Sequence, residues 1–447
     1  MASSNDRRMV LGAVLSPTST NIAGWRHPNA VSNAGVSLKD MTRFAEEAEK
    51  AKFDFVFLAD ELCAPDASPG ILSRDPVIYR FEPLTLTAAL AAGTERIGLI
   101  VTQTTTYNEP YHVARKLASI DNLSEGRAGW NLVTSYVTAE AANFSTAKHA
   151  SNVDRYARAE EFFEVTRGLW DSWDDDAFVL DKAEGRYFDP AGLHVLDHEG
   201  DSFSVRGPLN VVRPVQGRPV QVQAGSSPAG IALAAKYAEV VFTAQTTLEN
   251  ALAFTTELRE RTVEAGRPAG DIRVLAGTMP IVGETMAEAQ AKADELGALI
   301  HPEVGLARLS QLLGFDVSGM PLDSYLPDEI PETEAYKSRQ ALIVDLARRE
   351  HLTIGELYPR VVGSYGHRTV IGTPELIADE LQAWFEAGAV DGYIIAPAFL
   401  PDGLDDFSRL VIPELRRRGL FRDEYEGRTL RDHLRLAWPA RGAGWDE

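Results

Sequence analysis

Hydrogen-bonding side chains stand where apolar, strand-like runs of the sequence end. Asp60 ends one such run, and Thr105 belongs to a group of hydroxyl residues that follows another. A third run passes through Asn131 and finishes on Thr134 and Ser135, where a strand built only for a core would continue with Val, Ile or Leu. Amide and hydroxyl groups can bind a polar ligand, and a buried carboxylate needs a donor as its partner. The alternative interpretation is a set of polar turns.

The segment QAGSSPAG, residues 223–230, has the pattern of an anion-binding turn between a strand and a helix. Ser227 is a candidate N-cap, and Pro228 suits the first position of the helix that follows. Capping needs only one serine, so Ser226 can serve a ligand, and the free N–H groups of a helix start favour phosphate. Tyr156 is either a further phosphate donor or a residue at the edge of the core. A phosphate site beside Phe and Trp suits a phosphorylated aromatic cofactor better than a sugar.

These candidates require a fold that brings the ends of many strands together. Short apolar runs alternate with amphipathic helices, and the helix predicted at 37–52 places Met41, Phe44, Ala45 and Ala48 on one face. Eight such strands favour a (β/α)8 barrel over a doubly wound open sheet. The predicted strands cover residues 9–15, 53–60, 95–103, 126–135, 218–225, 238–245, 271–282 and 391–399. A barrel would collect the candidate residues at its carboxyl-terminal face.

Two long segments interrupt this alternation. Residues 174–217 and 301–370 contain Gly and Pro and no single long helix, and we expect both to be insertions on the carboxyl-terminal face. The chain, 1–447, is expected to form one barrel domain with a C-terminal extension after about residue 417. Acidic clusters in the first insertion lack paired histidines, so they indicate solvated loop charge, and no metal site is expected.

The overall composition narrows the range of partners. The chain has 447 residues and a net charge of −21, which disfavours binding to nucleic acid. A single cysteine, Cys63, excludes an intramolecular disulfide and fits a reducing compartment. The first residues contain no apolar run of signal-peptide length, and nowhere do about 18 apolar residues follow one another. We therefore expect a cytoplasmic protein that acts on a small molecule and has no membrane association.

Ordered motifs over nearly the whole chain resemble one family of enzymes. The sequence is similar to the bacterial luciferase-like superfamily, and within it to the branch of two-component FMNH2-dependent monooxygenases that act on nitrilotriacetate, EDTA and dibenzothiophene sulfone. The matching segments are GWRHP (24–28), KFDFVFLAD (52–60), EPYHVARKLASIDNLSEGRAGWNLVTS (109–135), ANFS (142–145), RYARAEEF (155–162), LWDSWDDDA (169–177), VRGPLNVVRPVQGRPVQVQAGSSPAG (205–230), HPEVGL (301–306), GTPELIADEL (372–381) and DGYIIAPAFLP (391–401).

This resemblance implies a (β/α)8 barrel that receives FMNH2 from a separate NAD(P)H-dependent flavin reductase and reacts it with O2. The resulting flavin C4a-peroxide would oxygenate a small heteroatom-containing compound, with cleavage of a C–N, C–S or carbon–halogen bond, as in xenobiotic degradation. The chain has no Rossmann fingerprint, which agrees with a reductant that arrives from a partner. The family also implies a homo-oligomer, either a dimer or a tetramer.

The resemblance assigns roles to individual residues. The implied cofactor-binding residues are Asp60 and Asn131 at the isoalloxazine ring and ribityl chain, Thr105 as a weaker candidate, and Tyr156, Ser226 and Ser227 at the phosphate. The implied substrate-pocket residues are Phe57 and Phe242.

Two departures from the family pattern bear on the substrate. Thr20 and Asn21 stand in a segment where the sulfone-oxidising relatives have an additional histidine, and Leu312 and Leu313 stand where those enzymes have a pocket histidine. His27 is then the best titratable group near the mouth and a candidate catalytic residue, with a loop-packing role as its alternative. We therefore expect the substrate to differ from that of the sulfone-oxidising relatives.

Three other functions fit the same barrel. The protein could cleave flavin or a related heterocycle, could use a deazaflavin as an oxidoreductase, or could bind flavin without catalysis. Product analysis with excess reduced flavin, titration with both cofactors, and rapid mixing of the reduced complex with O2 would separate these functions.

Overall fold

The computed structural model describes residues 7–16, 20–65, 67–145, 149–331, 333 and 337–442. Within these residues eight parallel strands form a closed barrel, because β11 pairs with β1 and β8 pairs with β9. In order around the barrel the strands are β1 (Val10–Val14), β2 (Phe55–Leu58), β3 (Gly98–Thr104), β4 (Ala128–Val133), β7 (Val220–Ala224), β8 (Val240–Thr243), β9 (Arg273–Val282) and β11 (Gly392–Ile395). The predicted (β/α)8 barrel is confirmed, and the open sheet is excluded.

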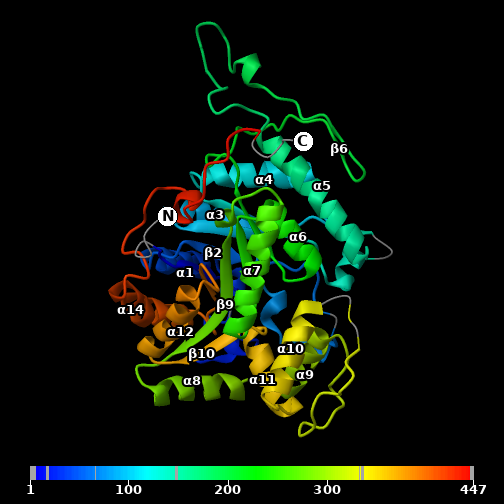
Figure 1. Cartoon of the computed structure of the whole chain (residues 1–447), viewed down its shortest axis with the longest axis vertical. Coiled ribbons are helices and arrows are strands. Elements are labelled where there is room, and N and C mark those ends of the chain that lie inside the picture. The colour runs from blue at the N-terminus through cyan, green and yellow to red at the C-terminus, as the bar shows by residue number, and fades with distance from the viewer. Residues whose placement is uncertain are drawn as a thin grey trace.

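Helices follow the strands and pack around the outside of the barrel (Figure 1). They include α1 (Leu38–Lys50), α3 (Pro83–Gly93), α4 (Pro110–Leu123), α5 (Asn152–Trp170), α6 (Pro228–Tyr237), α7 (Leu248–Glu264), α12 (Pro374–Glu386), α13 (Asp402–Asp406) and α14 (Ile412–Arg417). The Ser37 side chain caps α1, and the buried face of this helix consists of the four residues predicted for it. In the described part of the chain no helix is long and apolar enough to cross a lipid bilayer.

A further strand, β10 (Arg368–Gly372), joins the sheet outside the barrel and was not predicted from the sequence. It pairs with the second half of β9, from Thr278 to Val282, while the first half of β9 pairs with β8 and β11. The apolar part of β10 is only Val370 and Ile371, so its strand pattern is too short to recognise. The long strand β9 therefore pairs with barrel strands through its first half and with β10, outside the barrel, through its second half.

The two insertions lie at opposite ends of the barrel, which corrects one expectation (Figure 1). Residues 301–370 contain α9 (Pro302–Leu313), α10 (Lys337–Arg349) and α11 (Ile354–Ser364), and they follow β9 and α8 (Met286–Ala298) at the carboxyl-terminal face. Residues 174–217, with the short strands β5 (His198–Glu199) and β6 (Ser204–Val205), instead connect the end of α5 to the start of β7. A barrel helix returns the chain to the amino ends of the strands, so this insertion lies at the amino-terminal face.

The C-terminal segment fills the amino-terminal end of the barrel. Helix α15 (Leu430–His433) places Leu430 in the apolar core inside the barrel, together with Leu434. Gly98 and Gly129, near the starts of β3 and β4, leave space for this residue, since a Cβ on Gly98 would lie 2.4 Å from Leu430 Cδ1. The extension thus closes the floor of the barrel, where the sequence predicted only a C-terminal extension.

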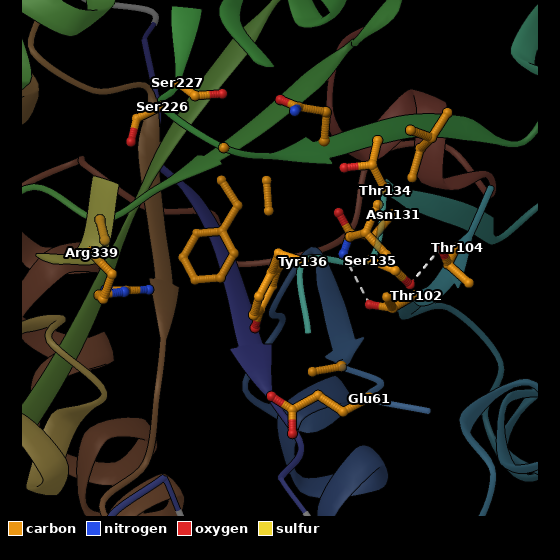
Figure 2. Close-up of a pocket in the computed structure, with 18 of the residues that line it drawn as sticks. Glu61, Thr102, Thr104, Asn131, Thr134, Ser135, Tyr136, Ser226, Ser227 and Arg339 are labelled. Atoms are coloured by element: carbon orange, nitrogen blue, oxygen red, sulfur yellow. Dashed lines mark hydrogen bonds between the residues drawn. The ribbon is translucent and has the colours of Figure 1, made fainter. Parts of the chain in front are cut away.

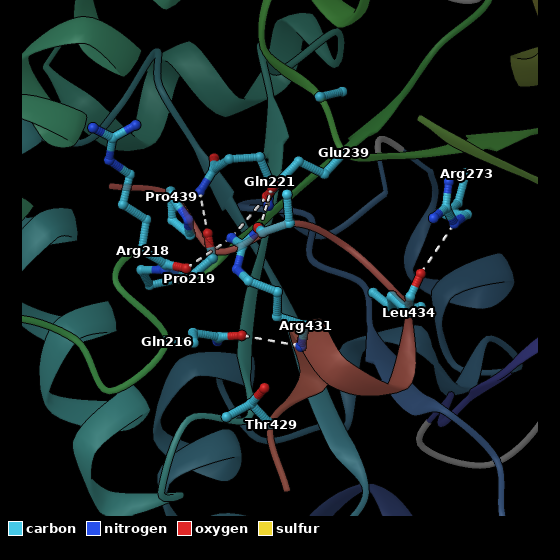
Figure 3. A network of polar contacts seen from close by, with 12 residues as sticks. Gln216, Arg218, Pro219, Gln221, Glu239, Arg273, Thr429, Arg431, Leu434 and Pro439 are labelled. Atoms are coloured by element: carbon cyan, nitrogen blue, oxygen red, sulfur yellow. Dashed lines mark hydrogen bonds and ion pairs between the residues drawn. The ribbon is translucent and has the colours of Figure 1, made fainter. Parts of the chain in front are cut away.

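Polar contacts fix this segment in place (Figure 3). The Arg431 guanidinium forms an ion pair with Glu239 and donates a hydrogen bond to the Arg218 carbonyl at 3.1 Å. Arg273 Nε donates to the Leu434 carbonyl at 3.0 Å. Arg431 is only 2% exposed, so these partners satisfy a charge that would be costly to bury alone.

Candidate active site

A cavity of about 590 Å³ opens at the carboxyl-terminal face, between the strand ends and the insertion of residues 301–370. Figure 2 shows its residues converging from several strand ends. The cavity wall contains the predicted residues Phe57, Asp60, Asn131, Tyr156, Ser226, Ser227 and Phe242, together with Thr134 and Ser135. Residues far apart in the sequence are thus brought together as a barrel requires.

Asn131 lies beside Thr102 because the pairing register of β3 and β4 places the two residues opposite each other. Asn131 Nδ2 donates a hydrogen bond to Thr102 Oγ1 at 2.9 Å (Figure 2). Asn131 Oδ1 is buried and accepts no hydrogen bond within the described residues. A buried acceptor in a cavity wall that lacks a partner is suited to an N–H or O–H group of a ligand.

The end of β3 corrects the expectation for Thr105. Thr102 and Thr104 line the cavity, because alternate residues of a strand share one face. Thr105 is fully buried outside the lining, and its N–H donates to the Val133 carbonyl at 2.9 Å. The hydroxyl of Ser135 donates to Thr104 Oγ1 at 2.8 Å, so Thr104 takes the position in the wall that was predicted for Thr105.

The turn between β7 and α6 has the predicted form. Ser227 is the N-cap of α6 and accepts a hydrogen bond from the Gly230 N–H at 3.1 Å, with Pro228 as the first helical residue. Tyr156 reaches this turn from α5, and its hydroxyl lies 3.4 Å from Ser227 Oγ. Ser226 lines the cavity beside them. The turn offers hydroxyl groups and the positive end of a helix dipole to an anion.

Two carboxyl groups in the cavity wall are shielded from water. Asp60 Oδ1 lies 4.0 Å from the Arg80 guanidinium, and its side chain is 13% exposed. Burial raises the pKa of Asp60 to about 6, although Arg80 opposes the increase. Burial also raises the pKa of Glu140, which accepts a hydrogen bond from the Leu62 N–H at 3.0 Å. Asp60 is therefore mainly an acceptor at neutral pH and becomes a donor in mildly acidic solution.

An aromatic wall runs from β2 to the insertion. The rings of Phe57 and Phe242 meet edge to face with centroids 5.6 Å apart, and Phe242 stacks on His367 at 5.2 Å. Gly277 makes room for this imidazole, since a Cβ there would lie 2.4 Å from His367 Nδ1. Burial and the charge of Arg339 lower the pKa of His367 well below its ordinary value, so the ring is neutral at physiological pH.

The insertion supplies residues that sequence reasoning missed. Beside His367, the cavity is lined by Arg308, Leu312, Arg339, Leu342 and Tyr365. Only Leu312 stood out in the sequence, as a departure from the family pattern. None of these residues follows a predicted barrel strand, so the rule that places sites at strand ends could not identify them.

His27 was expected near the mouth as a candidate catalytic residue, but it lies outside the cavity lining. Its ring stacks on Phe399 with centroids 4.0 Å apart. His27 Nδ1 accepts a hydrogen bond from the Asn29 N–H at 3.2 Å, and Nε2 lies 3.7 Å from Glu295 Oε1 on α8. The ring face and both nitrogens are thus engaged by neighbouring segments, which fits the loop-packing alternative.

The acidic residues of the first insertion pair with basic side chains. Asp174 lies 3.0 Å from His194 Nε2, and Asp175 lies 2.6 Å from Arg213 Nη1. Across the residues that the structure describes, no group of three or more His, Cys, Asp or Glu side chains is arranged to hold a metal ion.

Comparison with known proteins identifies the family. A family model described as luciferase-like monooxygenase matches residues 18–391. N-acetyl-S-(2-succino)cysteine monooxygenase of Bacillus subtilis is 48% identical over 98% of both chains. Nitrilotriacetate monooxygenase component A of Aminobacter aminovorans is 47% identical over 97% of this chain and 98% of its own. The crystal structure of riboflavin lyase with modified FMN and riboflavin has a TM-score of 0.86 and 32% identity, covering 96% of both chains. The chain therefore belongs to the luciferase-like monooxygenase family and is a flavin-dependent monooxygenase.

Proposed function

We propose that the protein is the oxygenase component of a two-component system. It takes FMNH2 from a separate NAD(P)H:flavin reductase and, with O2, oxygenates a small heteroatom-containing organic compound, so that a C–N, C–S or carbon–halogen bond is cleaved. The observation that carries this proposal is one cavity that combines an anion-binding turn, an unsatisfied amide oxygen and an aromatic wall. The name of the relative that is a component A supports a divided system.

The cavity fits a flavin mononucleotide at both of its chemically distinct regions. Ser226, Ser227 and Tyr156 would hold the phosphate at the start of α6. Asn131 Oδ1 and Gln223 Oε1 are both buried in the wall without hydrogen-bond partners among the described residues, and they suit the N–H and O–H donors of the ring and ribityl chain. A volume of about 590 Å³ lies within the usual range for cofactor and ligand sites.

When reduced flavin is bound, it activates O2 and supplies one oxygen atom to the substrate. The protein contributes binding, orientation and exclusion of water. Phe57, Phe242 and the neutral ring of His367 form an aromatic surface, which would exclude water from the part of the cavity beside it. Asp60 provides a partly desolvated acceptor on a different part of the wall.

The test combines the purified protein with a generic flavin reductase, NADH, FMN and O2. We expect FMN or FMNH2 to bind at micromolar concentration, and we expect suitable substrates to increase oxygen consumption while hydrogen peroxide release falls. Failure to bind either form of FMN at these concentrations would refute the proposal. Appearance of cleaved flavin products with excess reduced riboflavin would favour the flavin-cleaving alternative. Tighter binding of a deazaflavin than of FMN would favour the deazaflavin-dependent oxidoreductase.

A further inference from the structure

Two side chains of the insertion, Tyr365 and His367, are separated by one residue and both line the cavity. They follow the end of α11, where Tyr365 and Gly366 adopt left-handed backbone conformations with φ angles of 53° and 71°. A bulky residue is rarely found in this conformation, so the surrounding structure must hold Tyr365 in it. Two residues span at most about 7 Å of chain, so the two side chains enter the cavity from neighbouring points of its wall.

Tyr365 has a hydroxyl hydrogen that a ligand can accept. Its hydroxyl oxygen accepts a hydrogen bond from Arg308 Nη2, and the guanidinium carbon lies 4.8 Å from the centre of the Tyr365 ring. The O–H itself donates to no acceptor within the described residues. Burial raises the pKa of Tyr365, although Arg308 opposes the increase, so the hydroxyl keeps its hydrogen at physiological pH. A hydrogen bond from a cation polarises the hydroxyl and makes it a stronger donor.

His367 supplies a neutral imidazole in a fixed orientation. The ring stacks on Phe242 with an angle of 18° between the two planes, and Gly277 leaves space for the edge that carries Nδ1. Neither ring nitrogen forms a hydrogen bond within the described residues, and Nδ1 is buried. A neutral imidazole has one N–H donor and one bare nitrogen that accepts. Since the ring is held before a ligand arrives, it loses little conformational freedom on binding.

The hydrogen-bonding capacity of this pair selects among ligand groups. Asn131 and Gln223, the acceptors proposed for the flavin, come from β4 and β7, whereas Tyr365 and His367 come from the insertion. A carboxylate or an ester can only accept hydrogen bonds, and an ammonium group can only donate them. A secondary amide has a carbonyl acceptor and an N–H donor on adjacent atoms. Of these groups, only the amide uses a donor and an acceptor of the wall together.

We propose that Tyr365 and His367 bind an amide group of the substrate. The Tyr365 O–H donates to the amide carbonyl, and the amide N–H donates to the bare nitrogen of His367. This inference rests on the proposed function, because it names the substrate class for the same cavity as a heteroatom-containing compound that bears a secondary amide. An analogue without the N–H leaves the imidazole nitrogen unpaired in a shielded wall, so the site discriminates against it.

The flavin is the competing ligand for this pair, because its pyrimidine ring also carries carbonyl and N–H groups. The two assignments make different predictions. Loss of a side chain that binds the flavin ring would reduce the affinity for FMN and for riboflavin alike. Loss of a side chain that binds only the substrate would leave both flavin affinities unchanged and would weaken the binding of an amide to the FMN-loaded protein.

The first experiment compares an amide with the ester of the same skeleton. N-(methylthioethyl)acetamide and methylthioethyl acetate both carry a thioether and a carbonyl, and they differ only in the N–H that the ester lacks. Calorimetric titration of the FMN-loaded protein with each compound, up to millimolar concentration, measures binding directly. We expect the amide to bind roughly 5- to 10-fold more tightly, because the ester leaves the imidazole nitrogen unpaired. Equal or tighter binding of the ester, or no binding of the amide, would overturn the proposal.

The second experiment assigns the two hydrogen bonds. His367→Phe keeps a ring beside Phe242 and should bind the amide roughly 5- to 10-fold more weakly while binding the ester as wild type does, so the preference for the amide disappears. Tyr365→Phe should weaken the binding of both compounds by a similar factor, because both have the carbonyl. Tyr358→Phe, on α11 but outside the cavity lining, is the matched control and should behave as wild type.

The affinity for FMN should stay unchanged in all three variants. A preference for the amide that persists in His367→Phe, or unchanged binding of both compounds by Tyr365→Phe, would overturn the proposal. Reduced FMN affinity in either variant would overturn it as well, because the pair would then bind the flavin ring. If Tyr365→Phe does not fold, because Arg308 loses an acceptor, the result for His367→Phe decides alone. Absence of FMN binding by the wild type would instead refute the proposed function.

Discussion

Thr102 Oγ1 and Asn131 Nδ2 lie 2.9 Å apart, and this hydrogen bond leaves Asn131 Oδ1 as an unsatisfied acceptor in the cavity wall. Asn131→Ala should therefore weaken FMN binding by roughly tenfold, because a hydrogen bond to the cofactor is lost. Fluorescence titration gives the Kd, and thermal unfolding should change little. Asn122→Ala, on α4 away from the cavity, is the control. Unchanged flavin affinity in Asn131→Ala would indicate that Asn131 has only a structural role.

Substitutions of Ser226 and Ser227 should distinguish an effect on FMN affinity from an effect on protein stability. Ser226→Ala should reduce the affinity for FMN several-fold, leave that for riboflavin unchanged and not alter Tm, because no hydrogen bond within the described structure depends on its hydroxyl. Ser227→Ala should reduce FMN affinity and also cost about 1 kcal/mol of stability, since this residue caps α6. Parallel titrations with FMN and riboflavin test both. An equal loss of affinity for the two flavins would argue against phosphate binding at this turn.

Asp60 should make stability depend on pH. Burial raises the pKa of Asp60 from 3.8 to about 6, so the folded state holds this proton more tightly than the unfolded state. The contribution of Asp60 to stability is therefore complete below about pH 4 and is lost as the pH rises through about 6. Relative to wild type, Asp60→Asn should gain on the order of 2 kcal/mol across this window.

Urea unfolding of the flavin-free protein at several pH values measures this effect. Asp176→Asn, at an exposed carboxylate of the first insertion, is the control and should show no such trend. A difference between wild type and Asp60→Asn that stays constant with pH would contradict the prediction.

His27 should matter for stability more than for catalysis. His27→Ala removes the stack on Phe399, which should lower the free energy of unfolding by about 1 kcal/mol. Because the ring is not part of the cavity lining, kcat should stay within about threefold of wild type. Steady-state oxygen consumption and thermal unfolding of the same preparation decide the matter. A large fall in kcat at unchanged Tm would restore a catalytic role.

Leu430 should be one of the most sensitive apolar positions of the protein. It is fully buried inside the barrel floor, so Leu430→Ala should cost about 3 kcal/mol by leaving a cavity against Gly98 and Gly129. Leu123→Ala, at a leucine that is 66% exposed at the end of α4, should cost well under 1 kcal/mol. Chemical denaturation compares the two variants. Equal losses would show that the tail does not complete the core.

The sequence identified several side chains at strand ends that the structure places in the cavity wall. Asp60, Asn131 and Ser226 stand at strand ends, and the closed topology alone brings them into one wall. Thr105 lies outside the cavity lining because strand geometry alternates, and a shift of one position moves a side chain from the cavity to the other face. The sequence could not show that His27 lies outside the cavity lining, because nothing in a loop sequence fixes which way the loop folds.

The insertion could not be interpreted in the same way. Arg308, Arg339 and His367 reach the cavity only through the packing of α9, α10 and α11 on one another, and no local pattern encodes that packing. The same limit applies to the first insertion, whose position at the opposite face follows from the direction of α5 and not from its composition. Local sequence thus predicts the scaffold and the part of the cavity wall at the strand ends, while tertiary packing determines the part that the insertion supplies.

The floor of the barrel has a consequence for the order of biosynthesis. All eight barrel strands have been synthesised by Ile395, but the residue that fills the space beneath them is Leu430. Without Leu430 the lower end of the barrel would lack an apolar side chain next to Gly98 and Gly129, which have none of their own. The core of the barrel can therefore be completed only after the C-terminal segment that contains Leu430 has been synthesised.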